Sequence, residues 1–96
     1  MSIRPISSNV DEVGKTIKST KKKYTWKMEM DGKHICIEFF NSVITGKKKI
    51  LQNGQVIYEN NQHSGAFHFP FTIGKHSLSL VQHGDNFELR INNNSF

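Results

Sequence analysis

The stretch KYTWKMEMDGKHICIEFF, residues 23–40, decides the fold of this chain. Its first half alternates large apolar side chains with polar ones, a period of two that is typical of a strand with one buried face. Asp31-Gly32 follows, a pair that favours a tight hairpin turn because Gly accepts a positive φ. The return segment alternates in the same way, with Ile35, Ile37 and Phe39 on one side. The stretch therefore predicts an antiparallel hairpin with one apolar face.

The rest of the chain repeats this pattern of short alternating segments separated by turns. A looser turn, NSVITG, precedes KKKIL, and Asn53-Gly54 leads into QVIY. Beyond a polar loop, the segments GAFHFPFTI, HSLSLV and NFELRI follow, with turns between them at Gly74-Lys75 and His83-Gly84-Asp85. Seven to eight strands with turns about every 8–12 residues predict an all-β fold, a compact antiparallel β-sandwich or small barrel. Pro70 cannot donate to a ladder, which predicts that its strand lies at an edge or at a bulge.

The apolar positions of these segments form the predicted core of a body that spans residues 23–96. A body of this size buries only about 60–65% of its unfolded surface, so we expect modest stability. The predicted core side chains are Tyr24, Trp26, Met28, Ile35, Ile37, Phe39, Ile50, Val56, Phe67, Phe69, Phe71, Ile73, Leu78, Leu80, Phe87, Leu89 and Ile91.

Positive charge is concentrated before this body. The chain has 96 residues, room for one domain, and a net charge of +5. Residues 1–23 hold six Lys or Arg against two Asp or Glu. Val10, Val13 and Ile17 recur at helical spacing, but an isolated helix this short is marginal in water. Residues 1–22 are therefore predicted to be a basic N-terminal arm, flexible or bound to a partner, before the β-sandwich domain at 23–96.

The cellular location of the protein is predicted from three features that are absent from the sequence. No apolar run approaches the roughly 18 residues that span a membrane, and the first residues lack the apolar stretch of a secretory signal. Cys36 is the single cysteine, so the chain forms no internal disulfide. A reducing, intracellular and cytoplasmic location is the expectation.

The residues that could carry chemistry form no recognised pattern. The five histidines, at 34, 63, 68, 76 and 83, show no metal-ligand spacing, so we predict no metal and no cofactor. His76 is expected to be half-buried and hydrogen-bonded. A nucleophilic site would have to come from Ser77, Ser79, His76, His83 and Asp85, which lie across a turn on a face expected to be exposed. Cys36 has His34 as its nearest cationic neighbour in sequence and is not expected to be reactive. We therefore expect no enzymatic activity.

The order of the motifs resembles one repeat of the Fas apoptotic inhibitory molecule family. That repeat has a strand with Trp, an Asp-Gly turn, a strand ending in an acidic–aromatic pair, a small residue before Gly-Lys-Arg/Lys, and a further Asp-Gly or Asn-Gly turn. Two later segments, 71–76 (FTIGKH) and 88–93 (ELRINN), resemble its remaining parts, so the resemblance covers residues 24–96. The residues that carry the first run are Trp26, Asp31, Gly32, His34, Ile37, Glu38, Phe39, Thr45, Gly46, Lys47, Lys48, Asn53 and Gly54.

The resemblance implies a compact antiparallel β-sandwich with a non-enzymatic, cytosolic role. Family members act in protein interaction, in the modulation of death-receptor and survival signalling, and in protection against protein aggregation. They usually carry two such domains, whereas this chain carries one, and the basic arm has no counterpart in the repeat. What the resemblance implies most directly is a β module that contacts other proteins.

Lysines are the best candidates for partner contact. In strand geometry Lys47 and Lys49 share one face, and Lys48 lies on the other. They could protect a sheet edge from edge-to-edge pairing, or form one basic patch with the arm for a partner with an acidic surface. The candidate partner-binding residues are Lys18, Lys21, Lys22, Lys23, Lys47, Lys48 and Lys49.

The expected function is that of a non-enzymatic intracellular protein-interaction module, a small accessory subunit of a larger protein assembly. The alternative is a small β-barrel nucleic-acid-binding protein that uses the basic arm. Such barrels bind single strands through surface aromatic residues beside basic ones. Phe40 and Tyr58 are the only aromatic residues left over for that purpose by the predicted core.

Overall fold

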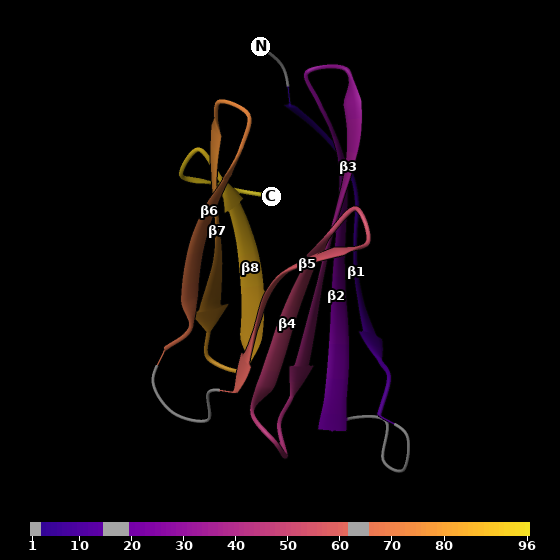
Figure 1. Ribbon diagram of the computed structural model, residues 1–96, viewed down its shortest axis with the longest axis vertical. Helices are drawn as coiled ribbons and strands as arrows, with labels where there is room; N and C mark the ends of the chain where they lie inside the picture. Colours follow the sequence, from indigo (N-terminus) through magenta and orange to yellow (C-terminus); the bar gives the residue numbers. More distant parts are fainter. Residues whose placement is uncertain (1–2, 15–19, 62–65) are drawn as a thin grey trace. The chain divides into compact units, whose positions relative to one another are not determined.

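The computed structural model describes residues 3–14, 20–61 and 66–96, which form nine strands and no α-helix (Figure 1). The strands are β1 (Ile3–Glu12), β2 (Lys21–Met30), β3 (Lys33–Ser42), β4 (Lys47–Gln52), β5 (Gln55–Asn61), β6 (His68–Ile73), β7 (His76–His83), β8 (Asn86–Ile91) and β9 (Asn94–Ser95). They make two antiparallel sheets, which confirms the predicted all-β, antiparallel fold class. The chain divides into two compact units, Met1–His63 and Ser64–Phe96, with one sheet in each.

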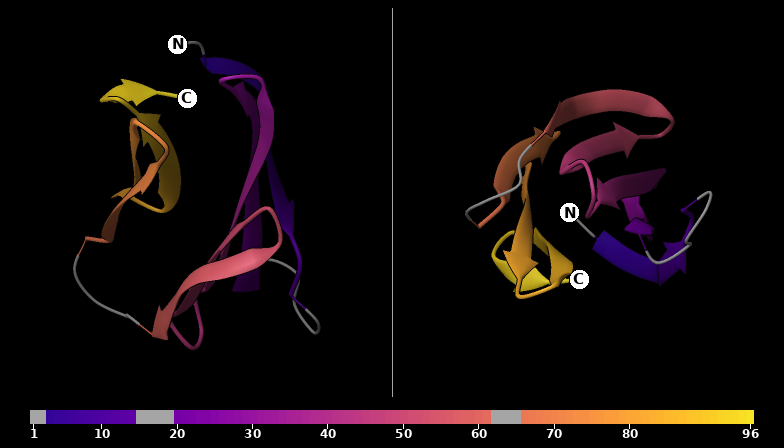
Figure 2. Two further views of the ribbon diagram at one scale, coloured as in Figure 1. Left: turned by 45° about the horizontal axis from the view of Figure 1, so that its top comes forward. Right: turned by 90° about the horizontal axis from the view of Figure 1, so that it is seen from below.

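The first unit is a five-stranded sheet in which β1 to β5 follow one another in chain order. Their colours therefore change in sequence across the sheet in Figure 2. Trp26 pairs with Ile37 and Met28 with Ile35, so the two alternating patterns of the hairpin fall in register. Asp31 and Gly32 both have positive φ, 52° and 80°, which confirms the tight turn. The apolar side chains buried on one face of this sheet are Tyr24, Trp26, Met28, Met30, Ile35, Ile37, Phe39 and Ile50.

The second unit is a four-stranded sheet of β6 to β9, again in chain order. β6 is an edge strand of this sheet and contains Pro70, as predicted. His76 is more deeply buried than predicted, at 1% exposure, and its Nδ1 accepts a hydrogen bond from the Asn92 side-chain amide at 3.2 Å. The buried apolar side chains of this unit are Phe67, Leu78, Leu80, Phe87, Leu89 and Ile91.

The predicted basic arm differs most from the structure. Residues 3–12 form β1, which pairs with β2 over almost its whole length and is interrupted by one register shift between Pro5 and Ser7. The pairing brings Asp11 opposite Lys23, and the Arg4 guanidinium lies 3.3 Å from the Glu29 carboxylate. These charge pairs, together with backbone hydrogen bonds, favour the strand over the helical spacing at Val10 and Val13. Ile17 lies outside the described residues.

Four predicted core positions are more exposed than the others. Val56 on β5 is 47% exposed, and three apolar residues of β6 are half-buried. Both strands are edges of their sheets, where one neighbouring strand is absent and less of each side chain is covered. Phe69 and Phe71 stack on each other, with ring centroids 5.7 Å apart. The β6 side chains are Phe69, Phe71 and Ile73.

Within residues 3–14, 20–61 and 66–96, no helix is long and apolar enough to cross a bilayer.

Candidate functional site

Phe40 marks the face of the five-stranded sheet opposite its buried side chains. It lies on β3, and its partners across the two neighbouring strands are Lys23 on β2 and Lys49 on β4. Because side chains alternate along each strand, burial of Tyr24, Phe39 and Ile50 on one face turns these three residues to the other. We call Lys21, Lys23, Phe40, Lys47 and Lys49 the lysine face.

Three ammonium groups of the lysine face lie over one aromatic ring. The Nζ atoms of Lys21, Lys23 and Lys49 are each 5.6 Å from the centroid of Phe40. Each contact is attractive, because the π-electron density of the ring favours a nearby cation. The three positive charges nevertheless repel one another, and a bound anion would reduce this repulsion.

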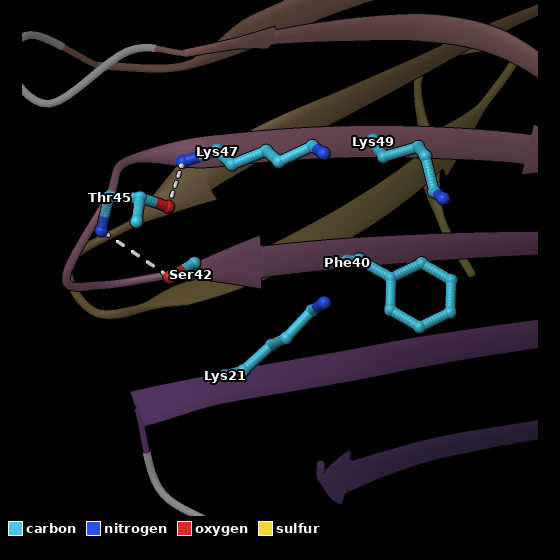
Figure 3. A pocket seen from close by; sticks show the side chains of 6 residues that line it. All are labelled: Lys21, Phe40, Ser42, Thr45, Lys47 and Lys49. Carbon is cyan, nitrogen blue, oxygen red and sulfur yellow. Dashed lines mark hydrogen bonds between the residues drawn. The ribbon is translucent and has the colours of Figure 1, made fainter. Parts of the chain in front are cut away.

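A depression of about 270 Å³ opens beside the ring, between β2, β3 and β4 (Figure 3). The last residue of β3 and the turn that follows it each supply one hydroxyl group at its edge, and β4 supplies two lysines. In Figure 3 the Lys21 and Lys49 side chains reach toward Phe40 from the strands on either side of it. The lining residues are Lys21, Phe40, Ser42, Thr45, Lys47 and Lys49.

The two hydroxyl groups are held as hydrogen-bond acceptors by the backbone of the turn. The Thr45 amide donates to Ser42 Oγ at 3.4 Å, a weak bond, and the Lys47 amide donates to Thr45 Oγ1 at 3.2 Å. A hydroxyl that accepts from a backbone N–H keeps its own proton for another acceptor. Both side chains can therefore donate to a group in the depression.

Carboxylates neutralise only some of the lysines. Lys23 Nζ lies 2.9 Å from Glu38, and this hydrogen bond raises the pKa of Lys23 against the opposing effect of burial. Lys47 Nζ lies 3.1 Å from Glu59 on β5. Among the residues that the structure describes, no carboxylate lies within ion-pair distance of Lys21 or Lys49. These two lysines give the depression its uncompensated positive charge.

The structure brings four of the seven predicted lysines together, namely Lys21, Lys23, Lys47 and Lys49. The prediction that Lys48 lies on the other face from Lys47 and Lys49 is confirmed, since Lys48 is 7% exposed and burial lowers its pKa. Lys22 pairs with Asn41, which is buried, and therefore shares the face of Lys48. Lys18 lies outside the described residues.

Ser42 and Thr45 line the depression but were not among the residues predicted for the site. Ser42 ends β3, two residues after Phe40 and on the same face, whereas Thr45 lies in the turn to β4, where no alternation fixes the direction of its hydroxyl. Phe40 was identified only as a spare aromatic residue. The second spare, Tyr58, pairs with buried Ile50 and so lies on the opposite face from Phe40. The two rings therefore cannot form one aromatic surface.

Two of the histidines are engaged in other contacts, and the free cysteine is partly buried. His83 Nε2 lies 3.1 Å from the Glu88 carboxylate, and His76 bonds to Asn92. Burial, followed by the charge of Glu38, raises the pKa of the Cys36 thiol, which makes the thiolate less available. No group of three or more metal-ligating side chains occurs within residues 3–14, 20–61 and 66–96, while His63 is outside them.

No protein-family model, curated protein or solved structure matches the chain. The resemblance of residues 24–96 to the Fas apoptotic inhibitory molecule repeat therefore stays a prediction from the sequence.

Proposed function

We propose that this chain is a non-enzymatic protein-interaction module that binds an acidic segment of a partner on its lysine face. The observation that carries the proposal is the position of Lys21 and Lys49. Their ammonium groups lie over Phe40, and among the described residues neither forms an ion pair with a carboxylate. A small accessory subunit of a larger intracellular assembly is the role that fits such a module. The expected lack of enzymatic activity is part of the same proposal.

The geometry favours docking over a purely protective role for the lysines. Lysines that only discourage edge pairing belong on edge strands. Lys21, Lys23 and Lys49 instead lie on β2 and β4, which have a neighbouring strand on both sides. Their amines gather over a single ring rather than spreading into solvent. This clustering gives an acidic partner a defined place to bind.

Binding of single-stranded nucleic acid is the second candidate, and Phe40 is the observation that favours it. An aromatic ring beside basic side chains is the usual platform for a stacked base. However, ammonium groups already lie over this ring, so a base would have to displace them. Tyr58 offers no second stacking surface on this face. An acidic protein segment needs no such displacement.

The proposal is tested by titrating a short polyglutamate peptide into the full chain and following backbone amide signals by NMR. We expect shifts concentrated at β2, at the turn after β3 and at β4. The affinity should fall as the salt concentration rises from about 50 mM to about 200 mM, because salt screens exposed charges. Shifts confined to the second unit, or no binding at low salt, would contradict the proposal.

A matched pair of double variants separates the site from the general charge. Lys21→Gln with Lys49→Gln removes two charges from the depression. Lys27→Gln with Lys33→Gln removes two charges from exposed positions of β2 and β3 outside it. We expect the first variant to lose most of the binding and the second to keep most of it. An equal loss in both would mean that only the overall positive charge matters.

A further inference from the structure

We propose that the depression beside Phe40 binds one phosphorylated serine or threonine side chain of the partner segment. This inference rests on the proposed function and specifies its ligand: a phosphomonoester on a polypeptide. The groups that would recognise it are two lysines without an ion pair and two hydroxyl groups that can donate, all around a depression on one sheet face.

The charge of the site suits a dianion better than a single carboxylate. A phosphomonoester carries about −1.5 to −2 charges near neutral pH. Lys21 and Lys49 approach the depression from β2 and β4, and among the described residues neither forms an ion pair. Glu59, which lies opposite Lys49 on β5, binds Lys47 instead. One glutamate would compensate only one of them, whereas one phosphate group could compensate both.

The hydrogen-bond donors of the site also suit phosphate. Ser42 and Thr45 each accept a backbone N–H bond and keep an O–H to donate. Together with the two ammonium groups they offer donors from the turn and from both flanking strands. A phosphate group presents three terminal oxygen atoms that can accept from several directions at once, which a planar carboxylate does less well.

The size and lining of the depression favour a phosphorylated protein over a nucleic acid strand. A volume of about 270 Å³ accommodates one compact charged group with its linking atoms. A nucleotide would also have to place its base, and ammonium groups occupy the space over the Phe40 ring that would receive it. A phosphorylated side chain needs only the charged end of the site.

The test is an NMR titration of the full chain with four probes. They are a short glycine–serine peptide with one central phosphoserine, the same peptide unphosphorylated, the same peptide with glutamate at that position, and an oligothymidine of similar length. We expect the phosphopeptide to bind at least about tenfold more tightly than either of the other peptides. Its shifts should centre on Ser42, Thr45 and Lys47, and inorganic phosphate should compete for the same signals.

Two variants test the assigned donors, and a third tests the carboxylate that competes for Lys47. Lys21→Gln with Lys49→Gln should weaken phosphopeptide binding by about tenfold, because charge-assisted hydrogen bonds to phosphate are strong. Thr45→Val removes one hydroxyl at nearly constant volume and should weaken binding by about two- to threefold. Glu59→Gln removes the carboxylate that competes for Lys47 and should strengthen binding by about twofold. This gain cannot arise from loss of folding.

The outcomes separate this inference from the proposed function. Equal affinity for the phosphoserine and glutamate peptides would overturn the phosphate site but leave an acidic docking face in place. Tighter binding of the oligothymidine than of the phosphopeptide would overturn the inference in favour of nucleic acid. If no probe binds, the phosphate site is overturned, and if polyglutamate also fails to bind, both proposals fail together.

Discussion

At the scale of single residues, the buried side chain of Trp26 contributes directly to the stability of the first sheet. It is 4% exposed and stacks on Tyr24, with ring centroids 5.8 Å apart. We predict that Trp26→Ala lowers the free energy of unfolding by about 3–5 kcal/mol, because truncation of a buried aromatic side chain loses apolar contact and leaves a cavity. Urea unfolding of both proteins measures the difference.

The native fluorescence of the wild-type protein is the control for this prediction. Trp26 is the only tryptophan, so its emission reports this one site. An emission maximum near that of indole in water would show that the ring is solvated. Burial of Trp26 could then not explain a loss of unfolding free energy in Trp26→Ala.

Glu88 makes the stability of the second unit depend on pH. Its carboxylate accepts hydrogen bonds from Ser95 Oγ at 2.8 Å and Arg90 Nη1 at 3.1 Å, and these bonds, with His83, lower its pKa. A lowered folded-state pKa stabilises the protein above the unfolded value of about 4.3, and this contribution is lost as pH falls through the folded value.

Glu88→Gln should therefore lose stability at neutral pH and depend less on pH than the wild type between neutral and strongly acidic solution. Urea unfolding midpoints at several pH values measure this slope. Ser95→Ala should show part of the same effect, because the Ser95 hydrogen bond is the largest cause of the pKa shift. An identical slope for Glu88→Gln and the wild type would refute the assignment.

Among the strands and turns, the same turn chemistry occurs in both sheets. Asn53, at the turn from β4 to β5, exchanges two hydrogen bonds with the Cys36 backbone of β3, at 2.8 Å and 2.7 Å. Asn92, at the turn from β8 to β9, does the same with Ser77 of β7, at 2.7 Å and 3.0 Å. Both asparagines have positive φ. Because each one bonds to the backbone of the adjacent strand, Asn53 extends the pairing of β4 with β3, and Asn92 extends the pairing of β8 with β7.

Gly54 tests the conformational requirement of this turn. Its φ is +83°, and a Cβ built there would meet nothing within 4 Å, so any cost comes from the backbone alone. We predict that Gly54→Val lowers the free energy of unfolding by about 1–2 kcal/mol, since a β-branched residue is strained in the left-handed region. Thermal unfolding checks this, and Gln55→Val, one residue later without a positive φ, is the control. Equal stability of the two variants would rule out the backbone explanation.

For the chain as a whole, the distribution of positive charge leads to a binding prediction. Changing Lys21, Lys22 and Lys23 together to Gln should weaken polyglutamate binding, with the largest effect at low salt. The fold should survive, because the one ion pair that the structure gives these lysines, between Lys23 and Glu38, is partly exposed and contributes about 1 kcal/mol or less. Lys22→Gln alone should have little effect, because Lys22 lies on the opposite face from Phe40.

Unchanged binding by the triple variant would move the interaction away from the lysine face. The edge strands of the five-stranded sheet, β1 and β5, would then be the places to look. Each has one side without a neighbouring strand among the described residues, where an extended peptide could add to the sheet. Competition by a peptide of β-strand sequence would measure that mode.

The sequence by itself determined the strands β2 to β8, though not the two-residue β9, because a period of two, Asp-Gly and Asn-Gly turns and an edge-confined proline are local signals. Trp26, Ile37 and Leu89 are buried as their alternation predicts. It also placed Lys47 and Lys49 on one face and Lys48 on the other, since side-chain direction in a strand follows from position alone.

Only the tertiary structure decided which lysines meet. Lys21 and Lys49 are far apart in sequence, and it is the register of β2, β3 and β4 that brings both to Phe40. The strand β1 was missed for a related reason: its residues are mostly exposed, and its pairing depends on backbone bonds and charges supplied by β2. Ser42 joined the site because it pairs with Lys21 across β2 and β3, and Thr45 joined it through the path of a turn that no local pattern specifies. Local periodicity fixes the direction of a side chain, but its neighbours depend on how distant segments pair.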